Sequence, residues 1–209
     1  RRQRQMCIRD RVVAASATVS ISDNPSSANL NLIAAEAGVV TATLAADSLS
    51  NLGSLTTSST DVITVSVNDG SGAAIDASDL SALGGKTAGT VTVSNDIAIT
   101  GNHDQVTAAL VDASTKVTAS TATVTINDGN GTAIDATELS AIGGATGGDV
   151  TVSNAIAITG NHDEVREALV ASATKVLAST ATVTINDGDS TSITATELSD
   201  IGSSTGGTV

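Results

Sequence analysis

Two histidines, His103 and His162, are the residues best suited to acid–base or metal chemistry, and an aspartate directly follows each of them. An imidazole beside a carboxylate is typical of a general base with its orienting group, or of two ligands of one metal ion. The histidines lie 59 positions apart and no cysteine follows Cys7, whereas a zinc site needs clustered ligands. No G-x-S-x-G nucleophile motif accompanies them. We therefore interpret each histidine as the first residue of a capped helix, and we expect no catalysis.

Three Gly-rich loops offer the hard oxygen ligands that calcium prefers. They read NDGSG, NDGNG and NDGDS, and in two of them an aspartate follows a few positions later. The loops match neither the EF-hand nor the nonapeptide calcium repeat. The third copy has Thr194 where the second has an aspartate, and threonine caps helices but is a poor calcium ligand. We expect no cofactor, with weak calcium binding as the alternative. The candidate ligands are Asn68, Asp69, Asp76, Asn127, Asp128, Asp135, Asn186, Asp187 and Asp189.

These residues recur because the chain repeats itself every 59 positions. The segment TVTINDGNGTAIDATELSAIGG at 123–144 has close matches at 64–85 and 182–203, and the segment at 150–165 matches 91–106. Such a period is typical of one supersecondary unit copied in tandem, in which each copy packs against its neighbours. It divides the chain into a divergent or partial copy over 12–61, repeats over 62–120 and 121–179, and a truncated copy over 180–209.

The first half of each unit predicts a strand, a polar loop and a short helix. In the second copy the strand is expected over Thr121–Ile126. Asp135 is expected to cap the helix, with Glu138 as its reciprocal capping partner. Gly143 and Gly144 are expected to end the helix in a left-handed conformation.

The second half of each unit predicts further strand structure and a second helix. Apolar residues of one parity run from Val150 to Ile158, which indicates one long strand or two short ones bent at Ser153–Asn154. A helix is expected after the N-cap Asn161, with Glu164 as capping partner. Its apolar stripe is expected to be Val165, Ala168 and Leu169.

Two further expectations concern the loops and the N-terminal copy. Asp128 and Asn154 end their strands at equivalent places, and their side chains are expected to accept hydrogen bonds from backbone amides of the turn. In the divergent copy a helix is expected over 28–37 and a strand over 39–44.

Strands that alternate with helices at this spacing predict parallel pairing. The expected fold is therefore an α/β solenoid of tandem β–α repeats with a parallel sheet and short helices. The alternative is a series of all-β sandwich repeats, because NDGNGT between alternating runs also resembles a hairpin turn and Thr and Val are good strand formers.

The composition excludes several partners. The net charge is −13 and there is no Phe, Tyr or Trp, so the chain lacks both the basic stripe and the stacking platforms of nucleic-acid-binding proteins. No apolar run is long enough to span a bilayer. Residues 1–11 hold five of the nine basic residues. They resemble the translation of a sequencing-library adapter and are expected to lie outside the fold, although a basic binding arm is the alternative.

The segments VTINDGNGTAIDATELSAIGG and VTVSNAIAITGNHDEV resemble tandem units of very long, acidic surface proteins of marine bacteria, especially cyanobacteria. The resemblance implies a bacterial adhesin-like protein that is secreted or on the cell surface and has a passive or adhesive role. The chain stops inside a repeat, so we expect a fragment of a longer protein. The expected function is a stalk, spacer or surface coat whose partners are the neighbouring repeats, with no external ligand identified. The alternative is a calcium-responsive binding module.

Overall fold

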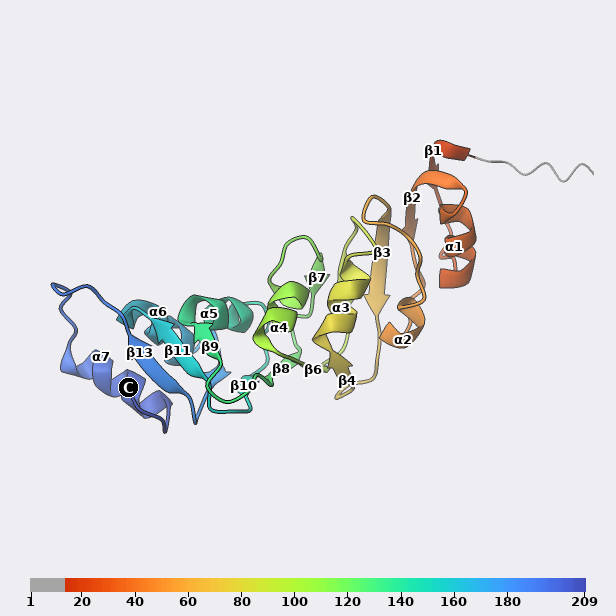
Figure 1. Cartoon of the computed structure of the whole chain (residues 1–209). Coiled ribbons are helices and arrows are strands. Elements are labelled where there is room, and N and C mark those ends of the chain that lie inside the picture. Colours follow the sequence, from red (N-terminus) through yellow and green to blue (C-terminus); the bar gives the residue numbers. More distant parts are fainter. Residues whose placement is uncertain (1–13) are drawn as a thin grey trace, which may run out of the picture.

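The computed structural model describes residues 14–209, and it is an α/β structure whose elements follow one another along a curved row (Figure 1). The expectation for residues 1–11 lies outside the described residues. The helices are α1 (Ser27–Ala34), α2 (Leu49–Leu52), α3 (Ala77–Gly84), α4 (His103–Leu110), α5 (Ala136–Gly144), α6 (His162–Leu169) and α7 (Ala195–Ser204).

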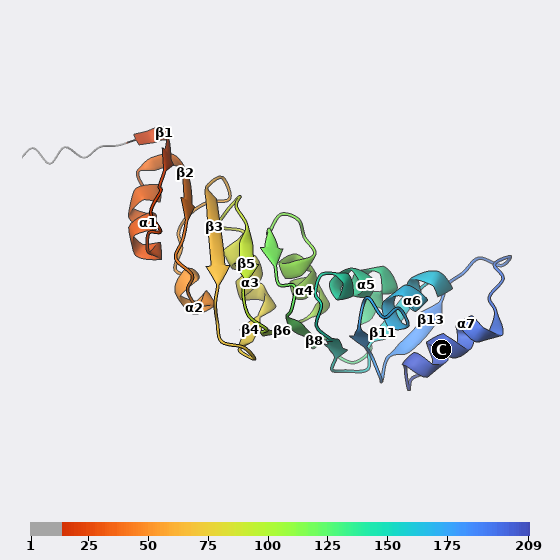
Figure 2. The ribbon, with the colours of Figure 1, turned by 180° about the vertical axis from the view of Figure 1, so that it is seen from behind.

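The strands are short and pair in parallel, and several of them are seen from behind in Figure 2. Their bounds are β1 (Ala14–Ser20), β2 (Ala37–Thr43), β3 (Val62–Val67), β4 (Ala74–Asp76), β5 (Val91–Val93), β6 (Ala98–Gly101), β7 (Val117–Thr118), β8 (Thr123–Ile126), β9 (Ala133–Asp135), β10 (Val150–Val152), β11 (Ala157–Gly160), β12 (Val176–Leu177) and β13 (Thr182–Ile185). Parallel pairing and intervening helices confirm the α/β class and make the sandwich alternative wrong.

We call each helix and the strands that lead into it a layer, named after its helix. The α3 layer contains β3 and β4, the α4 layer β5 and β6, the α5 layer β7, β8 and β9, the α6 layer β10 and β11, and the α7 layer β12 and β13. The strand orders are β1-β2-β3-β5-β7, β12-β10-β8-β6-β4 and β13-β11-β9. Each strand therefore pairs with a strand of the adjacent layer.

Successive layers meet in two ways. The α3 and α4 layers align strand for strand, since β3 pairs with β5 and β4 with β6. The α5 layer has a third strand, so β5 and β6 pair with β7 and β8 while β9 starts a new sheet. The α6 and α7 layers pair β10 with β12 and β11 with β13, with no third strand. At the α4–α5 and α6–α7 junctions the helices pack less extensively than at α3–α4 and α5–α6, and we call these two junctions steps.

Helices and strands differ in the spacing at which they pack. Helix axes pack about 8–10 Å apart, whereas paired strands lie about 4.8 Å apart. Layers that carry both elements can meet both spacings if the strands slide along their own direction or if the row curves. Because of the extra strand of the α5 layer, the sheet that includes β4 and the sheet that includes β9 both have strands in the α5, α6 and α7 layers.

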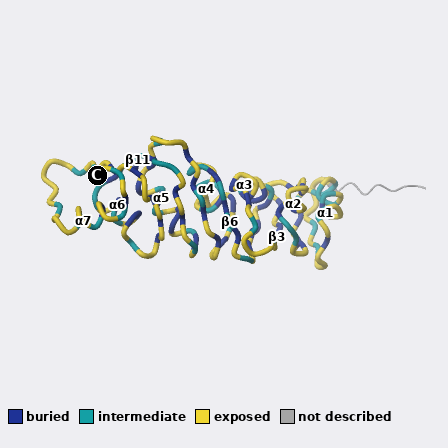
Figure 3. The backbone as a smooth tube through the Cα atoms, turned by 90° about the horizontal axis from the view of Figure 1, so that it is seen from below, coloured by how far each residue is buried: buried dark blue, intermediate teal, exposed yellow. Residues whose placement is uncertain are grey.

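The interior is an aliphatic seam that runs through all the layers (Figure 3). In β8, Val124 and Ile126 are buried while Thr123 is exposed, which is the alternation the sequence predicted. Leu139 and Ile142 of α5 are fully buried. Most buried polar side chains are threonines at the turns between layers, and their hydroxyls bond backbone carbonyls. These buried threonines are Thr57, Thr87, Thr115, Thr146, Thr174 and Thr205.

The predicted role of the glycines at the end of α5 is wrong. Gly143 and Gly144 both lie inside the helix, and its C-cap, Ala145, has a right-handed conformation. Gly143 instead allows close approach, because a Cβ atom there would lie 2.3 Å from the carbonyl oxygen of Thr174. Among the glycines of residues 14–209, only Gly72 and Gly131 have a positive φ.

The predictions for the second half of the unit and for the N-terminal copy are confirmed with small shifts. The second half of the unit forms two short strands, β10 and β11, with a bend between them. The α6 helix has the predicted capping box, since the Glu164 amide donates to Asn161 Oδ1 and the Asn161 amide donates to Glu164 Oε2, both at 2.9 Å. In the N-terminal copy, α1 and β2 lie where a helix and a strand were expected.

Candidate functional site

Each histidine is the first residue of its helix and contacts a carboxylate of the next layer. The His103 amide donates to Asp128 Oδ2 at 2.7 Å, and its ring Nδ1 lies 2.7 Å from Asp128 Oδ1. The His162 amide and ring contact Asp187 in the same way, both at 2.8 Å. Sequence reasoning placed the histidines correctly but missed these partners, which lie 25 positions away. Because every pair of positions recurs at the same spacing in a repeat, the sequence held no signal that singled out these partners.

The second ring nitrogen faces another carboxylate. His103 Nε2 lies 3.4 Å from Asp104 Oδ1, and the His103 side chain is only 14% exposed. Burial by itself would lower the pKa of His103. The hydrogen bond to Asp128, together with the negative charges of Asp128, Asp104 and Glu138, outweighs burial and raises that pKa above its ordinary value.

The His162–Asp187 pair repeats this electrostatic arrangement. The hydrogen bond to Asp187 raises the pKa of His162, burial opposes the rise, and the charges of Asp163, Asp187 and Glu197 add to it. Burial would raise the pKa of Asp187, but the hydrogen bonds from the His162 ring and amide outweigh it and lower that pKa. Arg166 Nη1 lies 3.4 Å from Glu197 Oε1, which links α6 to α7.

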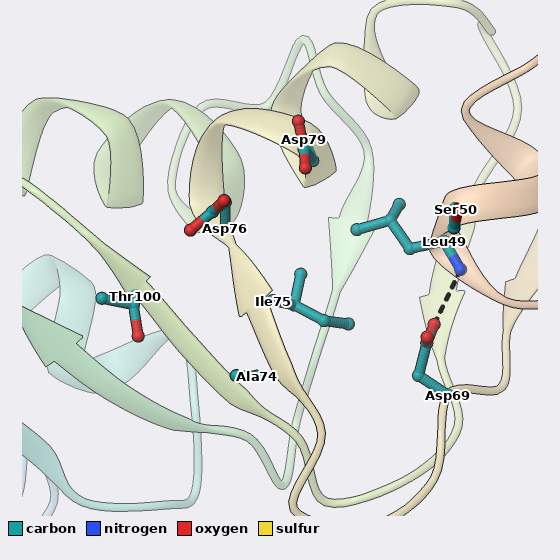
Figure 4. A pocket seen from close by; sticks show the side chains of 8 residues that line it. All are labelled: Leu49, Ser50, Asp69, Ala74, Ile75, Asp76, Asp79 and Thr100. Atoms are coloured by element: carbon teal, nitrogen blue, oxygen red, sulfur yellow. Dashed lines mark hydrogen bonds between the residues drawn. The ribbon is translucent and has the colours of Figure 1, made fainter.

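The junction between α2 and α3 keeps the backbone half of this contact without the imidazole. Leu49 opens α2, and its amide donates to Asp69 Oδ2 at 2.7 Å (Figure 4). An open hollow of about 420 Å³ lies beside this contact. Asp69, Asp76 and Asp79 line it, so the space beside Leu49 is acidic. The leucine shows that this junction accepts an apolar side chain in place of histidine.

The two upstream candidate calcium loops are packed against the bend of the following layer. The Gly131 amide donates to the Ala155 carbonyl at 2.7 Å, and Asn154 Nδ2 donates to the Asp128 carbonyl at 2.6 Å. Asn95 makes the same contact with the Asp69 carbonyl. The prediction for strand ends is therefore half wrong. Asp128 accepts an amide, but from the previous layer, and Asn154 donates to a carbonyl instead of accepting an amide.

The remaining candidate ligands are dispersed. Asn68, Asn127, Asn186 and Asp189 are exposed. Asp76 and Asp135 are the N-caps of α3 and α5, and the Asp135 amide donates to Glu138 Oε2 at 3.3 Å. Within residues 14–209 no group of three or more His, Cys, Asp or Glu side chains could hold a metal ion. The structure therefore places Asp69, Asp128 and Asp187 at helix N-termini, where carboxylates are favoured.

The geometry defines a cross-layer clasp, in which a carboxylate accepts a hydrogen bond from the first amide of a helix. At two of the three junctions it also accepts one from the imidazole Nδ1. The molecule is thus an α/β protein with parallel sheets and His–Asp clasps between layers. No known protein family matches the chain, and no curated protein and no solved structure does either. No helix of residues 14–209 has the length and hydrophobicity that a membrane crossing requires.

Proposed function

We propose that the chain is a structural repeat segment, a solenoid of 59-residue units with two layers each, that acts as a stalk, spacer or surface coat and carries out no catalysis. The observation that carries this proposal is that the layers contact their neighbours in order. The helices α3 to α7 pack in succession, and strands pair only with the adjacent layer. Such nearest-neighbour architectures grow by adding units, and their length is set by the number of copies.

The use of the reactive side chains also supports a structural role. The imidazoles of His103 and His162 are more than four-fifths buried and hydrogen-bonded to carboxylates that hold helix ends. A catalytic base needs access to a substrate proton, whereas both ring nitrogens here face aspartates. The same residues recur at each step, as expected for parts of a repeating frame.

The surface fits a segment exposed to water. Beyond residues 1–11 the chain has 21 acidic and 4 basic residues, a net charge of −17. Such a charge keeps proteins soluble and discourages association. A secreted or cell-surface location is proposed from the resemblance of the repeats to acidic bacterial surface proteins.

An in-register deletion tests the proposal. Removing residues 121–179 joins two identical ASTATVTIND contexts, because the sequence at 119–128 recurs at 178–187. Two layers are lost, so small-angle X-ray scattering should show a particle shorter by roughly 15–20 Å, from helix spacings of about 8–10 Å. Far-UV circular dichroism should still show cooperative melting.

The matched control removes half a unit. Deleting residues 121–149 places the α6 layer directly after the α4 layer and takes away β8, the partner of β6. This variant should lose much of its stability. The proposal fails if both deletions melt alike, or if the full-unit deletion unfolds.

A further inference from the structure

Each His–Asp clasp joins two adjacent layers. His103 and Asp128 join the α4 and α5 layers, and His162 and Asp187 join the α6 and α7 layers. These are the two steps, where helix–helix packing is thinner than in the aligned pairs. A contact at such a junction contributes a larger share of the local stability than the same contact at a junction whose helices pack extensively.

The charged groups around each imidazole are almost all acidic. His103 faces Asp104 on its own helix, Asp128 after β8 and Glu138 on α5. His162 faces Asp163, Asp187 and Glu197, of which Glu197 is also paired with Arg166.

A protonated ring carries a donor on each nitrogen and matches a carboxylate on both sides, whereas the neutral ring has only one donor. The helix N-terminus disfavours an added positive charge, but the facing carboxylates offset this.

We propose that the two His–Asp clasps are pH-dependent latches, which hold the α4 layer to the α5 layer and the α6 layer to the α7 layer more tightly in mildly acidic than in alkaline water. The inference rests on the layer contacts and does not require the spacer role. In both histidines the surrounding charges raise the pKa in the folded chain. The added stability is therefore complete below the unfolded value of about 6.5 and is lost as the pH rises through the folded pKa.

The junction between α2 and α3 is the natural comparison. Leu49 keeps the amide contact to Asp69 and has no group that titrates near neutrality. The junction between the α2 and α3 layers should therefore not respond to pH in this range. Leu49 also shows that a junction of this kind accommodates leucine, so His103→Leu and His162→Leu introduce a side chain that already occurs at the equivalent position.

The test combines two measurements on the full chain. Because the chain has only two histidines, their ring proton signals can be titrated directly by NMR in the wild type. Urea unfolding is then followed by far-UV circular dichroism at about pH 5.5 and about pH 9 for the wild type, the double variant H103L/H162L and L49H. The double variant corrects for the titration of the many carboxylates.

The expected result is that both histidines titrate above the ordinary value. Relative to H103L/H162L, the wild type should gain up to about tenfold in its folding equilibrium constant per histidine at the lower pH, as for a hydrogen bond to a charged group. L49H should add a third His–Asp clasp, to Asp69, and increase the pH dependence of the folding equilibrium constant. Histidines that titrate at or below the ordinary value, or a double variant that keeps the wild-type pH dependence, would overturn the proposal.

Discussion

The glycine at position 143 gives the sharpest test of how the layers pack. A Cβ atom on Gly143 would lie 2.3 Å from the Thr174 carbonyl oxygen and 2.8 Å from the Thr174 Cβ atom. Real Cβ atoms do not approach other atoms so closely, so Gly143→Ala must push α5 away from the turn that leads into β12. Overpacking of this kind costs about 1–3 kcal/mol of unfolding free energy.

The adjacent glycine is a matched control in the same helix. A Cβ atom on Gly144 would meet nothing within 4 Å. Alanine there should stabilise the helix by about 0.5–1 kcal/mol, since glycine is a poor helix former. Gly202 has the same open surroundings in α7, although it corresponds to Gly143 in the repeat. Gly202→Ala should therefore behave like Gly144→Ala.

Thermal melting followed at 222 nm measures these differences, because a chain without Trp or Tyr has no useful fluorescence signal. Gly143→Ala and Gly144→Ala should differ by about 1.5–4 kcal/mol, which corresponds to roughly 3–16 °C in Tm for a chain of this size. Gly84→Ala should repeat the loss, since its Cβ atom would lie 2.3 Å from the Thr115 carbonyl oxygen. Equal melting temperatures for the two α5 variants would refute the proposed close approach.

Two further predictions concern the turns and the loops. Thr87→Val should cost about 1–3 kcal/mol, because the buried hydroxyl accepts from the Ile63 and Gly89 amides and these would lose their partner. The exposed Thr92→Val in β5 is the control and should be nearly neutral by urea unfolding. Calcium should raise Tm no more than magnesium at equal concentration, because Asp128 and Asp187 already serve helix ends. A larger rise with calcium that Asp189→Asn removes would instead support the calcium-responsive alternative.

The local parts of the fold could be predicted from the sequence. Strand alternation in β8 and the capping boxes of α4 and α6 depend on residues within a few positions of each other, so the pattern contains the information. The burial of Leu139 and Ile142 follows from their shared helix face.

The parts that sequence reasoning missed depend on residues far apart in the chain. Position 143 has no room for a Cβ atom because Thr174 lies against it. His103 is hydrogen-bonded to Asp128. Neither partner lies within the local sequence pattern of the residue that it contacts. A Gly-Gly pair after a helix commonly marks a left-handed cap, so the local rule favoured the wrong role. The sequence also did not predict that β9 starts a new sheet. A short strand has the same alternation of buried and exposed residues whether it extends one sheet or begins another.

The α5 layer provides a strand to each of the three sheets, through β7, β8 and β9. The three sheets overlap in this layer, so no single ladder of hydrogen bonds has to run from one end of the structure to the other. A break that starts at either terminus must cross from one ladder to the next at this layer. Residues 117–144 should accordingly be the last segment to exchange its amide protons and the most resistant to mechanical extension.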